Sequence, residues 1–316
     1  MSKADSATKA FLSNPEVFAE AFNVGLFDGK HYIDPRSIRE VDTAEIAVAP
    51  SRDESHAKLT DFVQKQRDIL KMATVMESDA AYLVLLGLEN QRHVDYCMPV
   101  RNFLYDALTM EKQRRVVSDK YAKKENCKGL SEDEYICRFS RSDKIKPVIT
   151  LVVNWSGKPW DGPLTLRDMY DCPEDWILQY APDYRVNLLD PMTLPDEKLT
   201  EFQSELKPVF AFAKYQGDKR ELRFAMETRP ELFGAIGSLA ADVIFQTTGV
   251  NLKRRKEEEP VDMCNAIREM CADARTEGQE DIILKLARKF SAEEIASMVE
   301  YSLDDIQRIL TKYQPS

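Results

Sequence analysis

The sequence lacks an excess of basic residues. Among its 316 residues it has 44 Lys and Arg against 54 Asp and Glu, which gives a formal net charge of −10 at pH 7. A chain with this balance has no overall positive field that would attract a nucleic acid. Any contact with phosphate groups would therefore depend on a local basic patch.

Paired cysteines and long apolar runs are also missing. None of the six cysteines forms a Cys-x-x-Cys pair, which argues against a zinc cluster, and a disulfide framework is not expected at this chain length. The N-terminal stretch MSKADSATKAFL has no apolar core of the kind found in signal peptides. The longest apolar run, 80–88, is too short to span a bilayer. These absences predict a cytoplasmic protein with reduced thiols and no membrane partner.

Short apolar runs alternate with amphipathic segments along the rest of the chain. Two runs, 80–88 and 146–155 (KPVITLVVNW), are predicted to be buried strands, and the segment between them is long enough for a crossover between parallel strands. Residues 184–191 are a third strand candidate, whereas 66–76 fit either a strand or a helix. Helices are predicted near 15–26, 99–120 and 196–215. This alternation predicts an α/β fold with a mixed central sheet flanked by helices.

Local signals mark where several helices begin. Asn14 can cap the helix that starts at Pro15, and Pro99 suits the first turn of the helix that follows the first buried strand. Residues 121–144 are polar and are predicted to form a loop. In the helix after Pro99, the apolar side is marked by Val100, Phe103, Leu104 and Leu108.

The C-terminal region is predicted to be helical. The charge run KRRKEEEP (253–260) is typical of a linker, and acidic residues at the start of the last helix favour a packing or oligomerisation module over a DNA-reading one. Helices are expected at 279–290, 292–300 and 303–312. The two short helices begin at capping boxes, which are Ser291 with Glu294 and Ser302 with Asp305.

The first buried strand ends in polar residues. Glu89 and Gln91 lie two residues apart and therefore project from one face of the strand, at a strand end where ligands often bind in α/β sheets. A second acid, Asp68, lies upstream, and two converging carboxylates repel each other unless a cation lies between them. Because Mg²⁺ needs only one or two carboxylates, we expect the two carboxylates within about 6 Å of each other, with a raised pKa for at least one. The alternative is that both are solvated acids at strand ends.

The following helix carries two further candidates. Arg101 and Tyr105 are four residues apart and share one helix face, where an arginine could grip a phosphate with two hydrogen bonds. The alternative is a surface salt bridge from Arg101 to Asp106 or Glu111, with a half-buried tyrosine.

A basic segment lies directly after these residues. Residues 111–146 contain eleven Lys or Arg and seven Asp or Glu. In an acidic protein this local excess is the best candidate for a phosphate-contacting surface, although an ordinary solvated helix face explains it equally well. The basic cluster consists of Lys112, Arg114, Arg115, Lys120, Lys123 and Lys124.

Three stretches together resemble a known family. They are RDILK, then LLGLENQ…DYCMPVRNFLYDAL, then KIKPVITLVVNWSGKPWDGPLTLRDMY. The combination is similar to the Rpn family of recombination-promoting nucleases, also classed as transposases, within the PD-(D/E)XK nuclease superfamily. The likeness runs from the first helix to about residue 215 and continues more loosely through 261–286. It implies a restriction-endonuclease-like sheet.

The resemblance also implies roles for particular residues. Asp68 and Glu89 would be the metal ligands for Mg²⁺ or Mn²⁺, and Gln91 stands where the superfamily usually has lysine. Arg101 and Tyr105 would face the site from the following helix, and Glu20 would be an auxiliary acid on the first helix. A glutamine can orient water, but it is no base at neutral pH and adds no positive charge.

The implied function is metal-dependent DNA endonuclease activity linked to recombination or DNA mobility. The alternative is a catalytically inactive DNA-binding or protein-interaction module on the same fold, and homo-oligomerisation is left open. The expected organisation is a nuclease domain over 1–215, a helical extension and charged linker over 216–260, and a C-terminal helical region over 261–316.

Overall fold

A mixed five-stranded sheet forms the centre of the protein. The computed structural model describes residues 3–41, 68–77, 80–172, 174–248, 250, 260–299 and 301–312. The strand order is β1-β2-β3-β4-β5, with antiparallel pairing from β1 to β3 and parallel pairing from β3 to β5. This confirms the predicted α/β fold and the predicted parallel pair. The strands are β1 (Arg39–Glu40), β2 (Ile69–Glu77), β3 (Ala80–Gln91), β4 (Val148–Asn154) and β5 (Asn187–Leu189).

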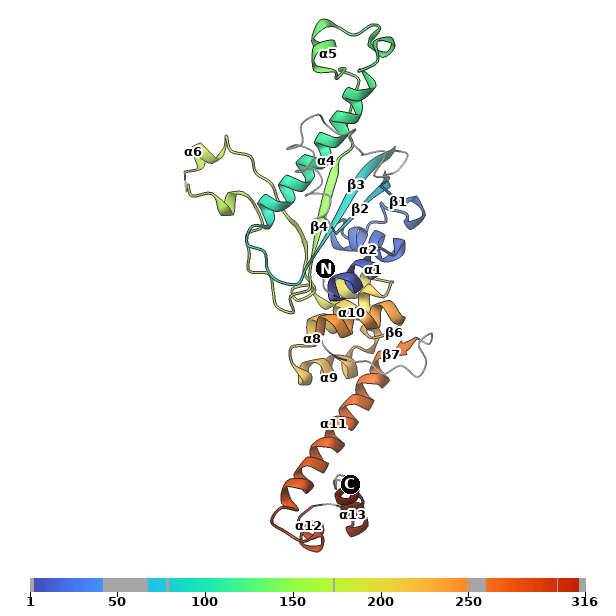
Figure 1. Ribbon diagram of the computed structural model, residues 1–316, viewed down its shortest axis with the longest axis vertical. Coiled ribbons are helices and arrows are strands. Elements are labelled where there is room, and N and C mark those ends of the chain that lie inside the picture. The colour runs from blue at the N-terminus through green and yellow to red at the C-terminus, as the bar shows by residue number, and fades with distance from the viewer. Residues whose placement is uncertain are drawn as a thin grey trace.

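Helices lie on both sides of the sheet (Figure 1). Asn14 caps α2 as predicted, because its side-chain oxygen accepts a hydrogen bond of 2.9 Å from the backbone N–H of Glu16. Two short strands, β6 (Ala235–Ile236) and β7 (Val261–Asp262), pair separately. The α-helices are α1 (Lys3–Leu12), α2 (Pro15–Gly25), α4 (Met98–Lys120), α5 (Glu132–Cys137), α6 (Asp175–Leu178), α7 (Asp196–Glu201), α8 (Leu206–Tyr215), α9 (Lys219–Thr228), α10 (Ser238–Thr248), α11 (Met263–Leu286), α12 (Ala292–Met298) and α13 (Leu303–Lys312). Single 3₁₀ turns lie at Pro35–Ser37, Lys124–Cys127, Arg167–Met169 and Pro230–Leu232.

One face of the sheet packs against an apolar core. Leu86 and Leu88 of β3 and Leu151 of β4 are completely buried in one cluster with side chains from α1, α2, α8 and α10. The indole of Trp155 closes this core, with its ring 5.5 Å from that of Phe210. Non-polar side chains are thereby removed from water along the length of the sheet, which is the main stabilising contribution.

The opposite face carries a polar layer under α4. Its sheet residues include Glu89, Gln91, Thr150 and Asn154, which are all buried, next to a small apolar cluster around Val152. The buried face of α4 is polar too, and it contains Asn102, Tyr105, Asp106, Thr109 and Lys112.

The apolar side of α4 does not face the sheet. Val100, Phe103 and Leu104 are 48%, 40% and 43% exposed. The periodicity alone would have directed this side inward, but the polar side chains of β3 and β4 need hydrogen-bonding partners, and the polar side of α4 supplies them. Asp106, for example, accepts a hydrogen bond of 2.6 Å from the hydroxyl of Thr150.

Two predicted segments differ in the structure. The helix expected over 196–215 is divided into α7 and α8, because the Glu20 carboxylate from α2 accepts hydrogen bonds from the backbone N–H groups of Gln203 and Ser204. The polar segment 121–144, predicted as a loop, contains α5, which begins with a capping box at Ser131. The ambiguous segment 66–76 forms most of β2 from Ile69 onward.

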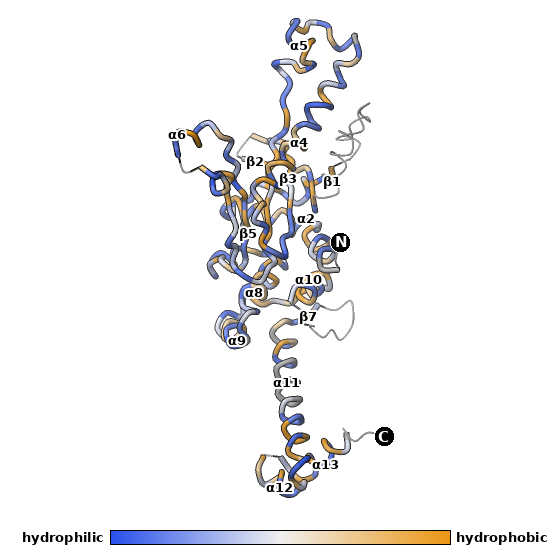
Figure 2. The backbone as a smooth tube through the Cα atoms, turned by 60° about the vertical axis from the view of Figure 1, so that its left-hand side comes forward, coloured by the Kyte–Doolittle hydropathy of each residue, from blue (hydrophilic) through white to orange (hydrophobic). Residues whose placement is uncertain are grey.

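The C-terminal helices form a small unit away from the sheet. Figure 2 shows α11 leading away from the rest of the chain to α12 and α13. Their shared cluster contains Ile283, Ile295, Ile306 and Ile309. Most of the predicted linker at 253–260 lies outside the described residues. No described helix is long and apolar enough to cross a membrane.

The predicted capping boxes differ in completeness. The box at Ser291 has both of its hydrogen bonds, as expected. At the second site, the Ser302 hydroxyl accepts from the backbone N–H of Asp305, but the Asp305 carboxylate binds that same hydroxyl instead of the backbone N–H of Ser302. The start of α13 therefore has one of the two hydrogen bonds that define a capping box.

Candidate active site

Glu89 is a buried carboxylate near the end of β3. Its side chain is 0% exposed, and its Oε2 atom lies 3.2 Å from Nη2 of Arg101 on α4. A buried charge without a partner is strongly destabilising, so the guanidinium explains how an ionised Glu89 can be accommodated. Arg101 of the following helix thus contacts the acid at the strand end.

Arg101 makes three contacts from one guanidinium. Besides Glu89, its Nη1 lies 3.1 Å from Oδ2 of Asp95, and its Nε donates a 3.0 Å hydrogen bond to the hydroxyl of Tyr105. Burial opposes the charge of Arg101, but attraction to Glu89 and the hydrogen bonds outweigh it and raise the pKa of Arg101. The alternative salt bridges to Asp106 or Glu111 do not form, because Asp106 binds Thr150 and Tyr184 and Glu111 binds other arginines.

Asp95 belongs to this site although the sequence did not indicate it. Its Oδ1 atom accepts a 2.9 Å hydrogen bond from the backbone N–H of Cys97, just before α4 begins. An aspartate near the start of a helix is a common capping signal, and this signal could have drawn attention to the residue. Its second oxygen is thereby oriented toward Arg101.

Asp68 lies next to Glu89 at the edge between β2 and β3. The register ends with Ile69 paired to Leu88, and Asp68 directly precedes this pair, as Glu89 directly follows it. The Oδ2 atom of Asp68 accepts a 2.8 Å hydrogen bond from the backbone N–H of Asn90. The two acids therefore flank the same strand end.

The pKa of Asp68 is raised, as predicted, but repulsion from Glu89, the predicted cause, is not among the causes. Burial is the largest cause, and it is partly offset by the hydrogen bond from Asn90 and by attraction to Lys9 and Arg101. The expected separation of about 6 Å between the two carboxylates stays a prediction.

Gln91, the last residue of β3, lies two residues after Glu89 and therefore on the same face of the sheet. It is 7% exposed, and its backbone carbonyl accepts a 2.7 Å hydrogen bond from the N–H of Trp155. The parallel register sets it beside Asn154 of β4. Within the described part of the chain its side-chain amide has no hydrogen-bond partner, so this amide is able to bind a water molecule or a ligand.

Asn102 is a second polar residue that sequence reasoning missed. It is 0% exposed, and neither its side-chain oxygen nor its side-chain nitrogen has a hydrogen-bond partner among the described residues. It lies on the buried face of α4, next to Arg101. Burial of an unsatisfied amide costs about 1–3 kcal/mol, so this residue makes the polar layer less stable than a fully bonded one.

The donor chemistry fits a hard divalent cation held by two carboxylates and water. Among the described residues no group of three or more His, Cys, Asp or Glu side chains is placed to hold a metal ion. Mg²⁺ commonly keeps several waters and uses only one or two carboxylates. Asp68 and Glu89 would be the two carboxylates of such a site.

The basic cluster is less available than its sequence suggests. Lys112 is buried, and Arg114 and Arg115 both bind Glu111, at 2.7 and 2.8 Å. The side-chain hydrogen bond from Arg114 is the main reason that the pKa of Glu111 is lowered to about 2. Lys120 lies 3.7 Å from Asp143, whereas Lys123 is exposed and the side chain of Lys124 lies outside the described residues. The patch is thus partly neutralised, and Lys112 does not belong to its surface.

Glu20 connects two helices of the fold. Its carboxylate binds the backbone N–H groups of Gln203 and Ser204 and the hydroxyl of Ser204, which joins α2 to the start of α8. Within the described residues it makes no hydrogen bond or ion pair with Asp68, Glu89 or Arg101.

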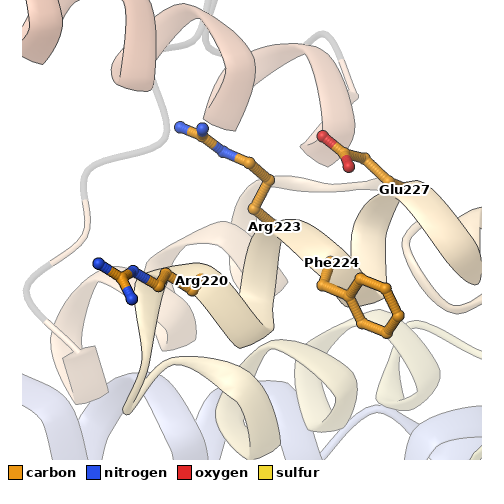
Figure 3. Close-up of a pocket in the computed structure, with 4 residues that line it drawn as sticks. All are labelled: Arg220, Arg223, Phe224 and Glu227. Carbon is orange, nitrogen blue, oxygen red and sulfur yellow. The ribbon is translucent and has the colours of Figure 1, made fainter.

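A separate shallow pocket lies on α9. It has a volume of about 310 Å³, and Figure 3 shows two arginine side chains extending from this one helix. Its lining residues are Arg220, Arg223, Phe224 and Glu227, so it shares no residue with the candidate site.

No protein-family model, curated protein or solved structure matches the chain.

Proposed function

We propose that the protein is a metal-dependent DNA endonuclease with a restriction-endonuclease-like sheet, in keeping with its resemblance to the Rpn family. The observation that carries the proposal is Glu89, a fully buried acid at the end of β3 that contacts Arg101, with Asp68 bound to the backbone of the next residue, Asn90. Ionisable groups with shifted pKa values, such as the half-buried Asp68, cluster at functional sites. The proposed setting is recombination or DNA mobility.

Each residue of the cluster has a proposed role. Asp68 and Glu89 hold Mg²⁺ or Mn²⁺, which when bound polarises a phosphate oxygen and lowers the pKa of a bound water. Gln91 orients the attacking water through its free amide. Arg101 binds the phosphodiester through its planar guanidinium, and Tyr105 holds that guanidinium in place. The exposed Lys123 contributes to DNA binding beyond the site.

Plasmid nicking with single-residue variants tests this proposal. Wild-type protein is expected to nick plasmid DNA in the presence of Mg²⁺, and the nicking should stop when EDTA is added. Glu89→Gln and Asp68→Ala should abolish nicking, because each removes a proposed ligand. Glu132→Gln and Asp133→Asn are matched controls, since both side chains are exposed on α5, and they should nick as wild type does.

A second candidate function is a binding module on the same fold. The ion pair between Glu89 and Arg101 favours it, because the buried acid is already compensated by the chain itself. The two functions differ in one outcome. Salt-dependent DNA binding without any metal-dependent cleavage of single- or double-stranded DNA or RNA would support the binding module and exclude the nuclease.

A further inference from the structure

Arg101 contacts Glu89 at the place where a metal ion would share that carboxylate. We propose that the Arg101 guanidinium competes with a divalent cation for Glu89, and that Asp95 and Tyr105 keep it tethered when the cation displaces it. Cation binding then frees Arg101 to bind the substrate phosphate. The competition depends on the contacts alone, whereas the phosphate step rests on the proposed function.

The exposure of the two partners makes the competition possible. The Glu89 side chain is 0% exposed, whereas the Arg101 side chain is 31% exposed. Glu89 cannot reach water, so its charge needs a cation beside it at all times. Arg101 reaches the surface and can leave Glu89 without being buried alone. The carboxylate is therefore the fixed partner and the guanidinium is the movable one.

The remaining contacts of Arg101 explain why it would stay near the site. Two of its three contacts, to Asp95 and Tyr105, do not involve Glu89. Asp95 is 27% exposed and is oriented by the backbone N–H of Cys97, so it persists as an anchor at the rim. A guanidinium held this way keeps donors available for a phosphate oxygen. Asp95 thus acts as a positioning residue.

The local charge balance also favours a divalent cation. Asp68, Glu89 and Asp95 bring up to three negative charges against the single charge of Arg101, which also acts on Asp68. Lys9 and Asp5, which influence Asp68 from α1, oppose each other in sign. One guanidinium leaves this cluster negative, and this excess attracts a cation of charge two.

Mn²⁺ binding measured by electron paramagnetic resonance tests the competition without any activity assay. Arg101→Gln is expected to bind Mn²⁺ about tenfold more tightly than wild type, since the lost charged hydrogen bond is worth on that order. In EDTA the same variant should melt several degrees lower, and Mn²⁺ should restore it. Arg167→Gln is the matched control, because it removes a surface ion pair with Asp175, and it should leave Mn²⁺ affinity unchanged.

Equal or weaker Mn²⁺ binding by Arg101→Gln would overturn the competition. If Arg101→Gln does not fold in EDTA, its refolding on addition of Mn²⁺ supports the proposal. If it does not refold, the Mn²⁺ affinity of Arg101→Lys tests the proposal instead. A lysine keeps the charge but loses the planar three-way contact, so it should bind Mn²⁺ more tightly than wild type does. Affinity no higher than wild type would count against the proposal.

The positioning role of Asp95 is tested by kinetics. Asp95→Asn should raise the KM for DNA several-fold with little change in kcat, and Asp161→Asn, which removes a nearby exposed partner of Tyr96, should change neither. A fall in kcat at constant KM would contradict the role. If Arg101→Gln alters Mn²⁺ affinity but wild type cleaves no DNA, the nuclease is refuted and the competition stands. If wild type cleaves DNA but Arg101→Gln leaves Mn²⁺ affinity unaltered, the competition is refuted and the nuclease stands.

Discussion

The two faces of the central sheet differ in what they contribute. The face toward α1, α2 and α8 is apolar, with Leu86 and Leu88 completely buried. The face toward α4 is polar, with Glu89 and Thr150 completely buried. Successive residues of one strand point to opposite faces, so β3 alone supplies both environments. One face provides stability, and the other provides chemistry at the expense of stability.

The energetic difference follows from desolvation. Each fully buried aliphatic side chain on the apolar face stabilises the fold by about 1.5–3 kcal/mol. Polar groups on the other face gain only about 0.5–1.5 kcal/mol net per hydrogen bond, and an unbonded group costs more than that gain. A polar layer is therefore retained for function and is stabilised by the apolar face behind it.

The largest expected effect on stability is a difference between two neighbouring residues of β3, Leu88 on the apolar face and Glu89 on the polar face. Leu88→Ala should lower the free energy of unfolding by about 2–5 kcal/mol, because it leaves a cavity in the core. Glu89→Gln should change stability far less, because the amide can still accept a hydrogen bond from Arg101. Urea denaturation measures both, and a larger loss for Glu89→Gln would break the comparison.

The amide of Gln91 should affect rate and leave folding nearly unchanged. Gln91→Ala is expected to slow cleavage by about ten- to a hundredfold, or 1.4–2.7 kcal/mol in barrier height. Gln91→Lys should keep measurable activity, since the added charge lies close to Glu89. Single-turnover cleavage should rank wild type and Gln91→Lys above Gln91→Ala, and Asp68→Ala last. Unchanged cleavage by Gln91→Ala would show that Gln91 has no part in the chemistry.

Replacing Asn102 tests how much the unsatisfied polar layer lowers the free energy of unfolding. Asn102→Leu has a similar volume and removes an unsatisfied buried amide, so it should raise the free energy of unfolding by about 1–3 kcal/mol. The same variant should lower cleavage if the amide binds a ligand or water. Denaturant midpoints compared with those of wild type decide the sign. A destabilised variant would show that the amide is satisfied in solution.

The outer surface of α4 should give the smallest effect, through Glu111. Its folded pKa of about 2 lies below the ordinary 4.5, chiefly because of the hydrogen bond from Arg114. The resulting stabilisation is present above pH 4.5 and is lost as the pH falls toward 2. Because the side chain is 33% exposed and its arginine partners lie at the surface, solvent screens these pairs, and Glu111→Gln should cost less than about 1 kcal/mol at pH 7. Melting temperatures of variant and wild type should converge as the pH falls to about 2, and a gap that persists at that pH would contradict this origin.

Local signals in the sequence were sufficient for several elements. The apolar runs that became β3 and β4, the cap at Asn14 and the box at Ser291 depend on residues close in the chain. Alternation along β3 was also enough to place Glu89 and Gln91 on one face. These features follow from backbone propensity, side-chain period and short-range hydrogen bonds, all of which can be evaluated within a few residues.

The tertiary structure decided the features that depend on distant partners. Residues 69–76 form a strand because β3 pairs with them. Helix α7 ends because Glu20 binds the backbone nearly two hundred residues away in sequence, at Ser204. The apolar side of α4 faces outward because the polar strand residues take its polar side. Asp95 joins Arg101 only once the turn before α4 brings them together. Hydrogen bonds and burial between remote segments outweigh local periodicity, because a buried polar group without a partner is more costly than an exposed apolar one.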